Sequence, residues 1–164
     1  MWFAKDLLVW EEAQKEFAKV LLDNTKEFRV ISLEFAQWKF KDWDIKIDCV
    51  PDWILTYEVK SDTMAKDTGN FVIETRFKWN PSWIFTSKAD YIVYFIKWEW
   101  RVQERWELIL RLMDVEKRET KGGDWRQSTL RVISCDKLPD LFTKLEVKNG
   151  KEDKRTETEW GDNI

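Results

Sequence analysis

The sequence contains no histidine, and this absence excludes several kinds of chemistry. Catalysis by Ser-His-Asp or Cys-His groups, histidine-based zinc sites and histidine general acids or bases all require the imidazole side chain. What remains is carboxylate, lysine, tyrosine and backbone chemistry. Oxygen ligands of this kind suit hard cations such as Mg²⁺ or Mn²⁺.

Cysteine is also scarce, because Cys49 and Cys135 are the only two in the chain. They are too few and too far apart to indicate a disulfide scaffold or a CxxC metal site, so we predict two buried free thiols in a reducing compartment. The longest apolar run, YIVYFI, is far shorter than the roughly 20 residues of a membrane-spanning helix. The N-terminal residues lack the apolar core of a signal peptide. These absences predict a soluble cytoplasmic protein that does not bind a membrane.

The composition is otherwise typical of one globular domain. The chain has 164 residues, of which 43% are hydrophobic, and this is enough to form a core. Charged residues make up 36%, yet the net charge is only -3, so both signs are interspersed. We predict a domain over residues 1–145. The polar residues 146–164 have almost no apolar spacing, which predicts a flexible tail.

Hydrophobic periodicity predicts a mixed order of helices and strands. Residues 6–22 carry apolar side chains at helical spacing, and residues 106–118 also look helical. The predicted strands are residues 28–35, 42–50, 53–60, 71–77, 91–96 and 128–134. The remaining segments are a polar loop (61–70), a turn (78–83), a short helix (84–89), a break (120–124) and a last helical turn (137–145). This order predicts a single-domain α/β fold with a central mixed β-sheet flanked by helices.

Asp44, Glu58 and Lys60 are the residues with the clearest chemical pattern. Glu58 and Lys60 are two apart on a predicted strand and project to the same face, while Asp44 lies on the preceding strand. Two such carboxylates can converge on one Mg²⁺, with the backbone carbonyl of Val59 as a further ligand. Lys60 would then orient or deprotonate a water and stabilise negative charge on phosphorus. The alternative is that these alternating charges form a solvated strand face.

Four segments in this order resemble the PD-(D/E)XK nuclease superfamily. They are WDIKI with Asp44, YEVKSD with Glu58 and Lys60, TGNFVIE with Gly69 to Glu74, and TSKADYIVYF with Thr86 to Phe95. The resemblance covers residues 1 to about 145 and is strongest to small phage-type and Holliday-junction-resolvase-like members. It implies a restriction-endonuclease-like fold and a Mg²⁺- or Mn²⁺-dependent deoxyribonuclease, with Asp44 and Glu58 as metal ligands and Lys60 as the catalytic lysine. It also implies the cytoplasm of a phage-infected host cell as the location.

The resemblance further implies accessory residues. Family members often carry an acidic residue on the first helix, and this place falls on Gln14, which is able to hold a water ligand. Glu11, one helical turn earlier, is the alternative to Gln14. Glu74 is a candidate to extend the metal shell, and Lys88 is a candidate phosphate contact, although both also fit an exposed surface.

Duplex or branched DNA is the partner that the resemblance implies, and basic residues of the central third are candidates to bind it. Phosphate contacts of this kind give sequence-independent, salt-sensitive affinity. A homodimer is expected from the resemblance and from the two-fold symmetry of such substrates. The candidates for DNA binding are Lys39, Lys41, Lys46, Lys60, Lys66, Arg76, Lys78 and Lys88.

Two other functions are open from the sequence. A nuclease-fold module that binds DNA or a protein without cutting would explain Gln14 in place of an acid. A packaging or structural α/β protein would leave the charged strand merely solvated and would have no affinity for DNA.

Tryptophan is abundant, with 12 residues against only 5 glycines. Trp79, Trp83, Trp98 and Trp106 lie where turns or polar surface are predicted. One hypothesis is that they form platforms that stack unpaired bases. The other is that they replace former glycine or polar residues, because a bulky side chain fits poorly at turn positions that require positive φ. Tryptophans lining one basic groove would favour stacking, and scattered tryptophans would favour replacement.

Overall fold

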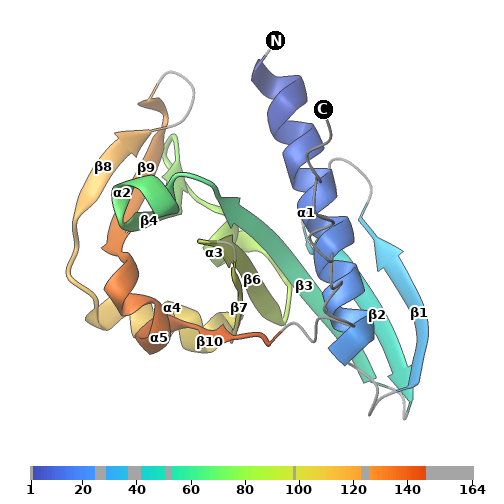
Figure 1. Cartoon of the computed structure of the whole chain (residues 1–164). Coiled ribbons are helices and arrows are strands. Elements are labelled where there is room, and N and C mark those ends of the chain that lie inside the picture. Colours follow the sequence, from blue (N-terminus) through green and yellow to red (C-terminus); the bar gives the residue numbers. More distant parts are fainter. Residues whose placement is uncertain are drawn as a thin grey trace, which may run out of the picture.

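Two β-sheets and the helices that cover them form the fold (Figure 1). The computed structural model describes residues 2–24, 29–36, 42–50, 53–97, 99–122 and 126–146. The helices are α1 (Trp2–Asn24), α2 (Ala65–Thr68), α3 (Trp83–Thr86), α4 (Arg105–Asp114), the 3-10 helix η2 (Cys135–Lys137) and α5 (Leu138–Leu141). The strands are β1 (Arg29–Phe35), β2 (Ile45–Val50), β3 (Trp53–Asp62), β4 (Asn70–Phe77), β5 (Asn80–Pro81), β6 (Tyr91–Ile96), β7 (Glu99–Glu104), β8 (Glu119–Gly122), β9 (Ser128–Ser134) and β10 (Thr143–Lys144).

The larger sheet has six strands in the order β1-β2-β3-β6-β7-β10. It is mixed, because β3 and β6 are parallel whereas the other neighbours are antiparallel. The predicted α/β fold with a mixed sheet flanked by helices is therefore confirmed. β3 changes its neighbours at Tyr57, since its pairing with β2 ends there and its pairing with β6 begins there.

A second, antiparallel sheet of four strands has the order β5-β4-β9-β8 and was not predicted. β7 was also not predicted, although Trp100 and Val102 alternate with polar residues along it. The polar loop contains the short helix α2, and the break at residues 120–124 overlaps the end of β8. α4 ends at Asp114, four residues before the predicted end.

Two hydrophobic clusters lie on opposite faces of the six-stranded sheet. α1 covers one face, where Phe17 is fully buried and contacts the Tyr57 ring edge-on at 5.5 Å between centroids. The other cluster joins β6 to the four-stranded sheet, α4 and α5. Cys49 belongs to the α1 cluster and Cys135 to the other, and both are buried free thiols, as predicted.

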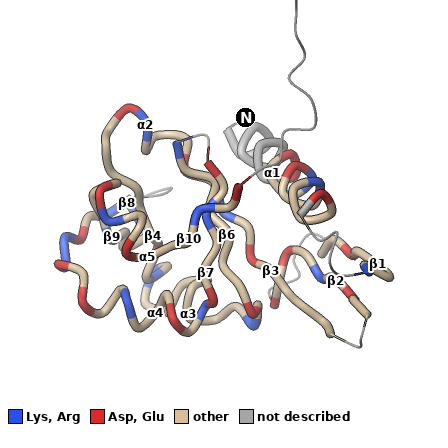
Figure 2. Tube along the Cα trace, turned by 60° about the horizontal axis from the view of Figure 1, so that its bottom comes forward, with Lys and Arg blue, Asp and Glu red and all other residues tan. Residues whose placement is uncertain are grey.

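Basic and acidic residues alternate along most elements of the described chain (Figure 2). No helix within the described ranges is long and apolar enough to cross a membrane. Lys39, Lys41, Trp98 and residues 147–164 of the predicted tail lie outside the described residues. The division into a domain and a tail therefore stays a prediction.

Candidate active site

Asp44 immediately precedes Ile45, the first residue of β2, where the pairing between β2 and β3 stops. Its backbone N–H donates to the carbonyl of Tyr57 at 2.8 Å, which continues the strand pairing by one bond. Its side chain then turns along β3, and Oδ2 accepts a hydrogen bond from the N–H of Val59 at 2.7 Å. The carboxylate is 5% exposed. The Asp44 carboxylate thus lies beside β3 at Val59, where the backbone of β2 would lie if β2 continued by one more pair.

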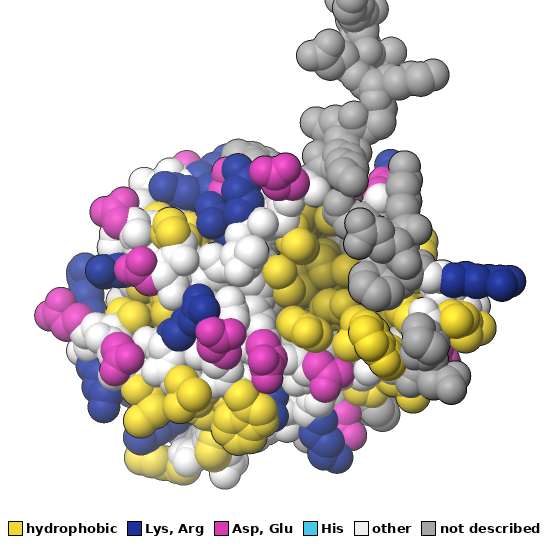
Figure 3. Space-filling view, turned by 90° about the horizontal axis from the view of Figure 1, so that it is seen from below, with side chains coloured by type: hydrophobic (Ala, Val, Ile, Leu, Met, Phe, Trp, Pro, Cys, Tyr) yellow, Lys and Arg dark blue, Asp and Glu magenta, His cyan; other side chains and the backbone are white. Residues whose placement is uncertain are grey.

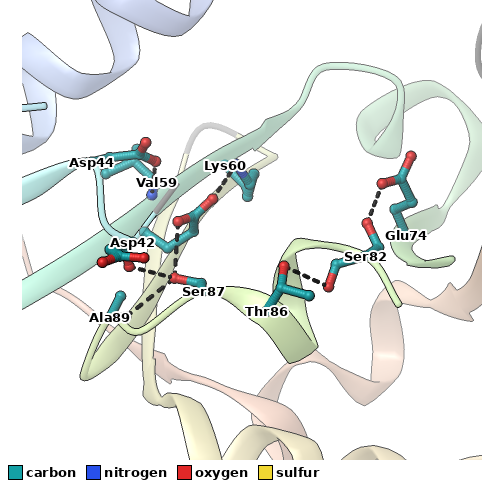
Figure 4. A network of polar contacts seen from close by, with 10 residues as sticks. Asp42, Asp44, Val59, Lys60, Glu74, Ser82, Thr86, Ser87 and Ala89 are labelled. Atoms are coloured by element: carbon teal, nitrogen blue, oxygen red, sulfur yellow. Dashed lines mark hydrogen bonds and ion pairs between the residues drawn. The ribbon is translucent and has the colours of Figure 1, made fainter. Parts of the chain in front are cut away.

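Glu58 and Lys60 project from the opposite side of β3 to the residues that face α1. Lys60 Nζ lies 2.6 Å from Glu58 Oε1. The Ser87 hydroxyl, which has one proton to donate, lies 3.1 Å from Glu58 Oε2 and 3.0 Å from the carbonyl oxygen of Asp42. Glu58 is 6% exposed, so both of its oxygens are held in a nearly closed environment. Figure 4 shows Asp44, Lys60 and Ser87 around this part of β3.

Acidic groups surround the Lys60 ammonium on several sides. Burial acts to lower the pKa of Lys60, but the charges of Glu58, Asp44 and Glu74 and the bond to Glu58 outweigh it, so this pKa is raised. The ammonium also lies 5.0 Å from the centroid of the Trp83 ring, within cation–π range. Lys60 therefore remains charged at neutral pH, where it can donate hydrogen bonds but cannot accept a proton.

Glu74 is held on β4 by two serines from other elements. Ser82, which precedes α3, and Ser128, at the start of β9, both donate to its carboxylate. Figure 4 shows the contact between Glu74 and Ser82. Glu74 thus lies across from β3 in a fixed orientation, close enough to Lys60 to affect it.

The formal charges of these groups leave room for a cation. Asp44, Glu58 and Glu74 carry three negative charges against the single positive charge of Lys60, and such an excess in a buried site favours a bound divalent ion. The described residues contain no group of three or more His, Cys, Asp or Glu placed to hold a metal. A cation here would thus have few protein ligands, as is usual for Mg²⁺, which keeps several waters.

The backbone of Val59 faces the same edge as Asp44. In a β-strand the N–H and C=O of one residue point to the same side. Because the Val59 N–H points to Asp44, its carbonyl oxygen is directed toward that edge as well. The two carboxylates and this carbonyl are all oxygen groups, which is the ligand type that a hard cation prefers.

Gln14 is the residue of α1 with an unsatisfied buried group. It is 4% exposed, and its Nε2 has no hydrogen-bond partner among the described residues. Phe17, three residues later on the same helix, contacts Tyr57 of β3, and α1 runs opposite to β3 (Figure 1). Glu11, one turn earlier, is partly exposed. A buried amide without a partner fits a polar ligand better than a purely apolar contact.

Some candidates for DNA binding are engaged in ion pairs. Lys46 lies 3.7 Å from both Glu34 and Asp48 on the exposed face of β1 and β2. Lys88 lies 3.0 Å from Asp42, but its side chain is 74% exposed and is free to reach solvent.

The other candidates are spread over separate elements. Lys66 lies on α2, Arg76 near the end of β4 and Lys78 in the turn after it, and all three are exposed. Lys39 and Lys41 fall outside the described residues, so their DNA binding stays a prediction.

The described tryptophans among the four occupy different environments. Trp79 is 95% exposed in the turn after β4, whereas Trp83 packs against the core cluster below Lys60. Trp106 is 62% exposed at the start of α4. Hydrophobic side chains interrupt the charged surface on the face of the molecule shown in Figure 3. The environments of these three residues differ, and Trp98 lies outside the described residues, so the stacking hypothesis stays a prediction.

No tryptophan within the described ranges has positive φ, but a neighbour of Trp79 does. Among the described non-glycine residues, Lys78, Lys97 and Arg126 have positive φ. Lys78 takes this conformation in the turn that it shares with Trp79. Replacement of former glycines by tryptophan therefore has no support from backbone conformation at the described positions.

Sequence reasoning did not single out Ser82, Ser87 and Ser128. They lie 8, 29 and 54 residues from the carboxylates that they contact, so no local pattern links them. Ser87 had one signal, since it lies within the segment Thr86 to Phe95 that carries part of the family resemblance.

The chain matches no protein-family model and no curated protein. Among solved structures it is similar to a nuclease from a fusselovirus, at 11% sequence identity and a TM-score of 0.47. The similarity covers 87% of this chain and 86% of that chain. A likeness at this level carries no argument about what the present chain does.

Proposed function

We propose that this chain is a metal-dependent DNA endonuclease or resolvase of the PD-(D/E)XK type that hydrolyses phosphodiester bonds with an activated water. The observation that supports this proposal is that Asp44 accepts the N–H of Val59, between Glu58 and Lys60, which form an ion pair, and that the charges of both acids act on Lys60. The three residue types are those that phosphodiester hydrolysis needs in a protein without histidine.

Asp44, Glu58 and the Val59 carbonyl would hold Mg²⁺ or Mn²⁺. Such an ion, when bound, polarises a phosphoryl oxygen and lowers the pKa of a water. The Lys60 ammonium would donate hydrogen bonds to the phosphate and stabilise the charge that develops on it. Ser87 keeps Glu58 oriented through its hydroxyl. Gln14, Glu11 and Glu74 are proposed as accessory groups around this centre.

Cleavage assays test the catalytic proposal. The substrates are supercoiled, linear, single-stranded and branched DNA, each with Mg²⁺ or Mn²⁺. We expect Lys60→Ala to lower the cleavage rate by about 10²–10³, because an aligned donor to the reacting phosphate is lost. Lys19→Ala, on the exposed side of α1, is the matched control and should cleave like the parent. Equal rates for Lys60→Ala and the parent, or no cleavage by either, would remove the catalytic proposal.

A second function, a nuclease-fold module that binds DNA or a protein without cutting, is favoured by one observation. Glu58 is engaged by both Lys60 and Ser87. Calorimetric titration with Mn²⁺ separates the two functions. Binding that is lost in Asp44→Asn and Glu58→Gln supports the enzyme, whereas DNA binding that is indifferent to metal supports the module. Absence of DNA binding even at low salt would point to a structural protein instead.

Duplex or branched DNA is the proposed partner, and a homodimer is the proposed assembly, because a two-fold pair of sites matches a two-fold substrate. Sedimentation of the protein with and without a branched DNA tests this assembly. A species with the mass of one chain in both conditions would contradict it.

A further inference from the structure

One pocket lies over the four-stranded sheet, apart from the candidate active site. Its volume is about 380 Å³, and its lining includes Arg76, Lys121, Arg126 and Thr129. The only carboxylate among the described lining residues is that of Glu119. Three cations against one anion give this pocket a formal charge that favours a negatively charged ligand.

Strand register explains why two of the cations face the same pocket. Thr129 of β9 is paired with Arg76 of β4 on one side and with Lys121 of β8 on the other. Residues opposite each other in antiparallel strands project to the same face, with Cβ atoms about 5 Å apart. Lys121 Nζ donates to Thr129 Oγ1 at 2.6 Å, which holds the ammonium over the middle strand. Arg126 approaches from the segment that leads into β9.

These cations differ from several other basic residues on or beside β-strands. Lys46, Lys88 and Lys144 each form an ion pair with a nearby carboxylate. Within the described part of the chain, Arg76, Lys121 and Arg126 form no ion pair. Positive charges gathered in one pocket without carboxylate partners repel one another, so a bound anion would stabilise them.

The pocket is close to the candidate active site along β4. Arg76 follows Glu74 by two residues, but the register of β4 against β9 shifts between them, because Glu74 is paired with Leu130 and Arg76 with Thr129. Adjacent residues of β9 project to opposite faces, so Glu74 and Arg76 project to opposite faces of the four-stranded sheet. Glu74 in turn interacts electrostatically with Lys60. A polymer as long as a DNA strand could pass the edge of this sheet, with one phosphate at Lys60 and another at Arg76.

We infer that Arg76, Lys121 and Arg126 form a second phosphate-binding site, which holds the backbone of a DNA strand whose reacting phosphate lies at Lys60. Guanidinium groups bind two phosphate oxygens at once, and the ammonium adds a point charge. The choice of DNA as the ligand rests on the proposed function, whereas the affinity for phosphate rests on the pocket alone.

Salt-dependent binding without metal tests this inference independently of cleavage. The dissociation constant of a labelled blunt DNA duplex is measured by fluorescence anisotropy over a range of KCl concentrations, in the presence of a chelator. The variants are Arg76→Gln, Lys121→Gln and Arg126→Gln, with Lys19→Gln on α1 as the matched surface control. Each pocket variant should lower the slope of log K against log salt by about one, because each removes one phosphate contact. Lys19→Gln should leave the slope unchanged.

A second arm distinguishes a polymer from a small ligand. Inorganic pyrophosphate is titrated against the parent and Arg76→Gln by calorimetry. Pyrophosphate binding that depends on Arg76, together with unchanged DNA slopes in all three variants, would make the pocket a small-anion site and overturn the inference. Unchanged slopes without pyrophosphate binding, or no DNA binding by the parent at low salt, would overturn it as well.

The outcomes also separate this inference from the proposed function. Reduced salt slopes in variants of a parent that cleaves no DNA would uphold the phosphate site and remove the enzyme. Cleavage that requires Lys60, with salt slopes unaffected by the pocket variants, would uphold the enzyme and remove the phosphate site. Thermal unfolding of each variant shows whether the fold is kept, and Arg76→Lys, which retains the charge, should restore the slope.

Discussion

The two halves of β3 have different neighbours, and the candidate site lies in only one of them. From Trp53 to Tyr57 the strand is paired with β2, and from Tyr57 to Asp62 it is paired with β6. In the second half the edge that β2 leaves is taken by the Asp44 carboxylate, which accepts the Val59 N–H. A buried acid can thus be held as firmly beside a strand whose pairing stops as it would be within a continuing pair of strands.

The physical reason is the requirement of the backbone for hydrogen bonds. A buried N–H without an acceptor costs about 1–3 kcal/mol, so the Val59 N–H needs a partner beyond the point where the pairing of β3 with β2 stops. A carboxylate meets this need and is itself stabilised by the charge-assisted bond. One carboxylate oxygen of Asp44 therefore has a structural contact, which does not depend on the proposed metal binding.

The largest expected effect comes from removing the acid that distinguishes the second half. Asp44→Ala should lower the cleavage rate by about a thousandfold, because it removes a proposed metal ligand and frees the Val59 N–H. Asp48→Ala is the control, since Asp48 lies in β2 and accepts from Ser32 at 2.7 Å on the face away from α1. Gel-based cleavage rates check both. A similar loss of cleavage in both variants would mean that the position of Asp44 beside β3 has no special importance.

The next largest effect concerns the stability of the first half. Ile47 of β2 is 1% exposed and pairs with Leu55, so Ile47→Ala should lower the free energy of unfolding by about 2–5 kcal/mol. Ile54, on the opposite face of β3, is 59% exposed, and Ile54→Ala should cost less than about 0.5 kcal/mol. Urea denaturation measures both. Equal losses would contradict the assignment of the core to the face that α1 covers.

A smaller effect is expected from the hydroxyl that orients Glu58. Ser87→Ala should weaken Mn²⁺ binding and lower cleavage by about 10–100-fold, since such groups hold a ligand in place without touching the reacting atoms. The neighbouring Thr86→Val removes a hydroxyl that bonds only to the Ser82 carbonyl at 3.3 Å. Thr86→Val, the control, should keep the Mn²⁺ affinity and the cleavage rate of the parent. Calorimetry with Mn²⁺ would contradict the orienting function of Ser87 if the two variants bound the ion alike.

The smallest effect is a pH dependence at the residue where the two halves meet. Burial, and then the charges of Tyr91, Cys49 and Asp90, raise the pKa of Tyr57 well above its usual value of about 10. The unfolded chain ionises this tyrosine near pH 10 and the folded chain does not. The free energy of unfolding is therefore unaffected below about pH 10 and falls above it, by at most about 1.4 kcal/mol per pH unit.

Tyr57→Phe should flatten this alkaline decrease. Urea denaturation at several values between about pH 8 and pH 11 measures it. Tyr91→Phe is the comparison, because Tyr91 is only partly buried. A decrease of the same steepness in the parent and in Tyr57→Phe would show that other groups cause the alkaline loss.

Local patterns were sufficient for the elements that bury one continuous face. α1 and β3 show clear periodicity, and the same-face placement of Glu58 and Lys60 followed from alternation alone. The proximity of Asp44 could also be predicted, because consecutive strands usually pair. The four-stranded sheet could not be, since its pairing of β4 with β9 joins segments more than 50 residues apart.

The finer features of the candidate site depend on where strands end, and sequence alone does not give that. The contact of Asp44 with Val59 exists because β2 begins at Ile45, and the contact of Ser87 with Glu58 exists because α3 ends at Thr86. Boundaries of this kind are set by tertiary packing, which overrides local preference by a residue or two at each end.

The placement of one cysteine in each hydrophobic cluster makes the two cores separately observable. Cys49 reacts with a thiol reagent only when the α1 face of the large sheet opens, and Cys135 only when the packing beside the four-stranded sheet opens. The two rates of labelling would therefore report two local opening free energies in one unmodified chain. If the rates were equal at every denaturant concentration, the two faces of the large sheet would open as a single cooperative unit.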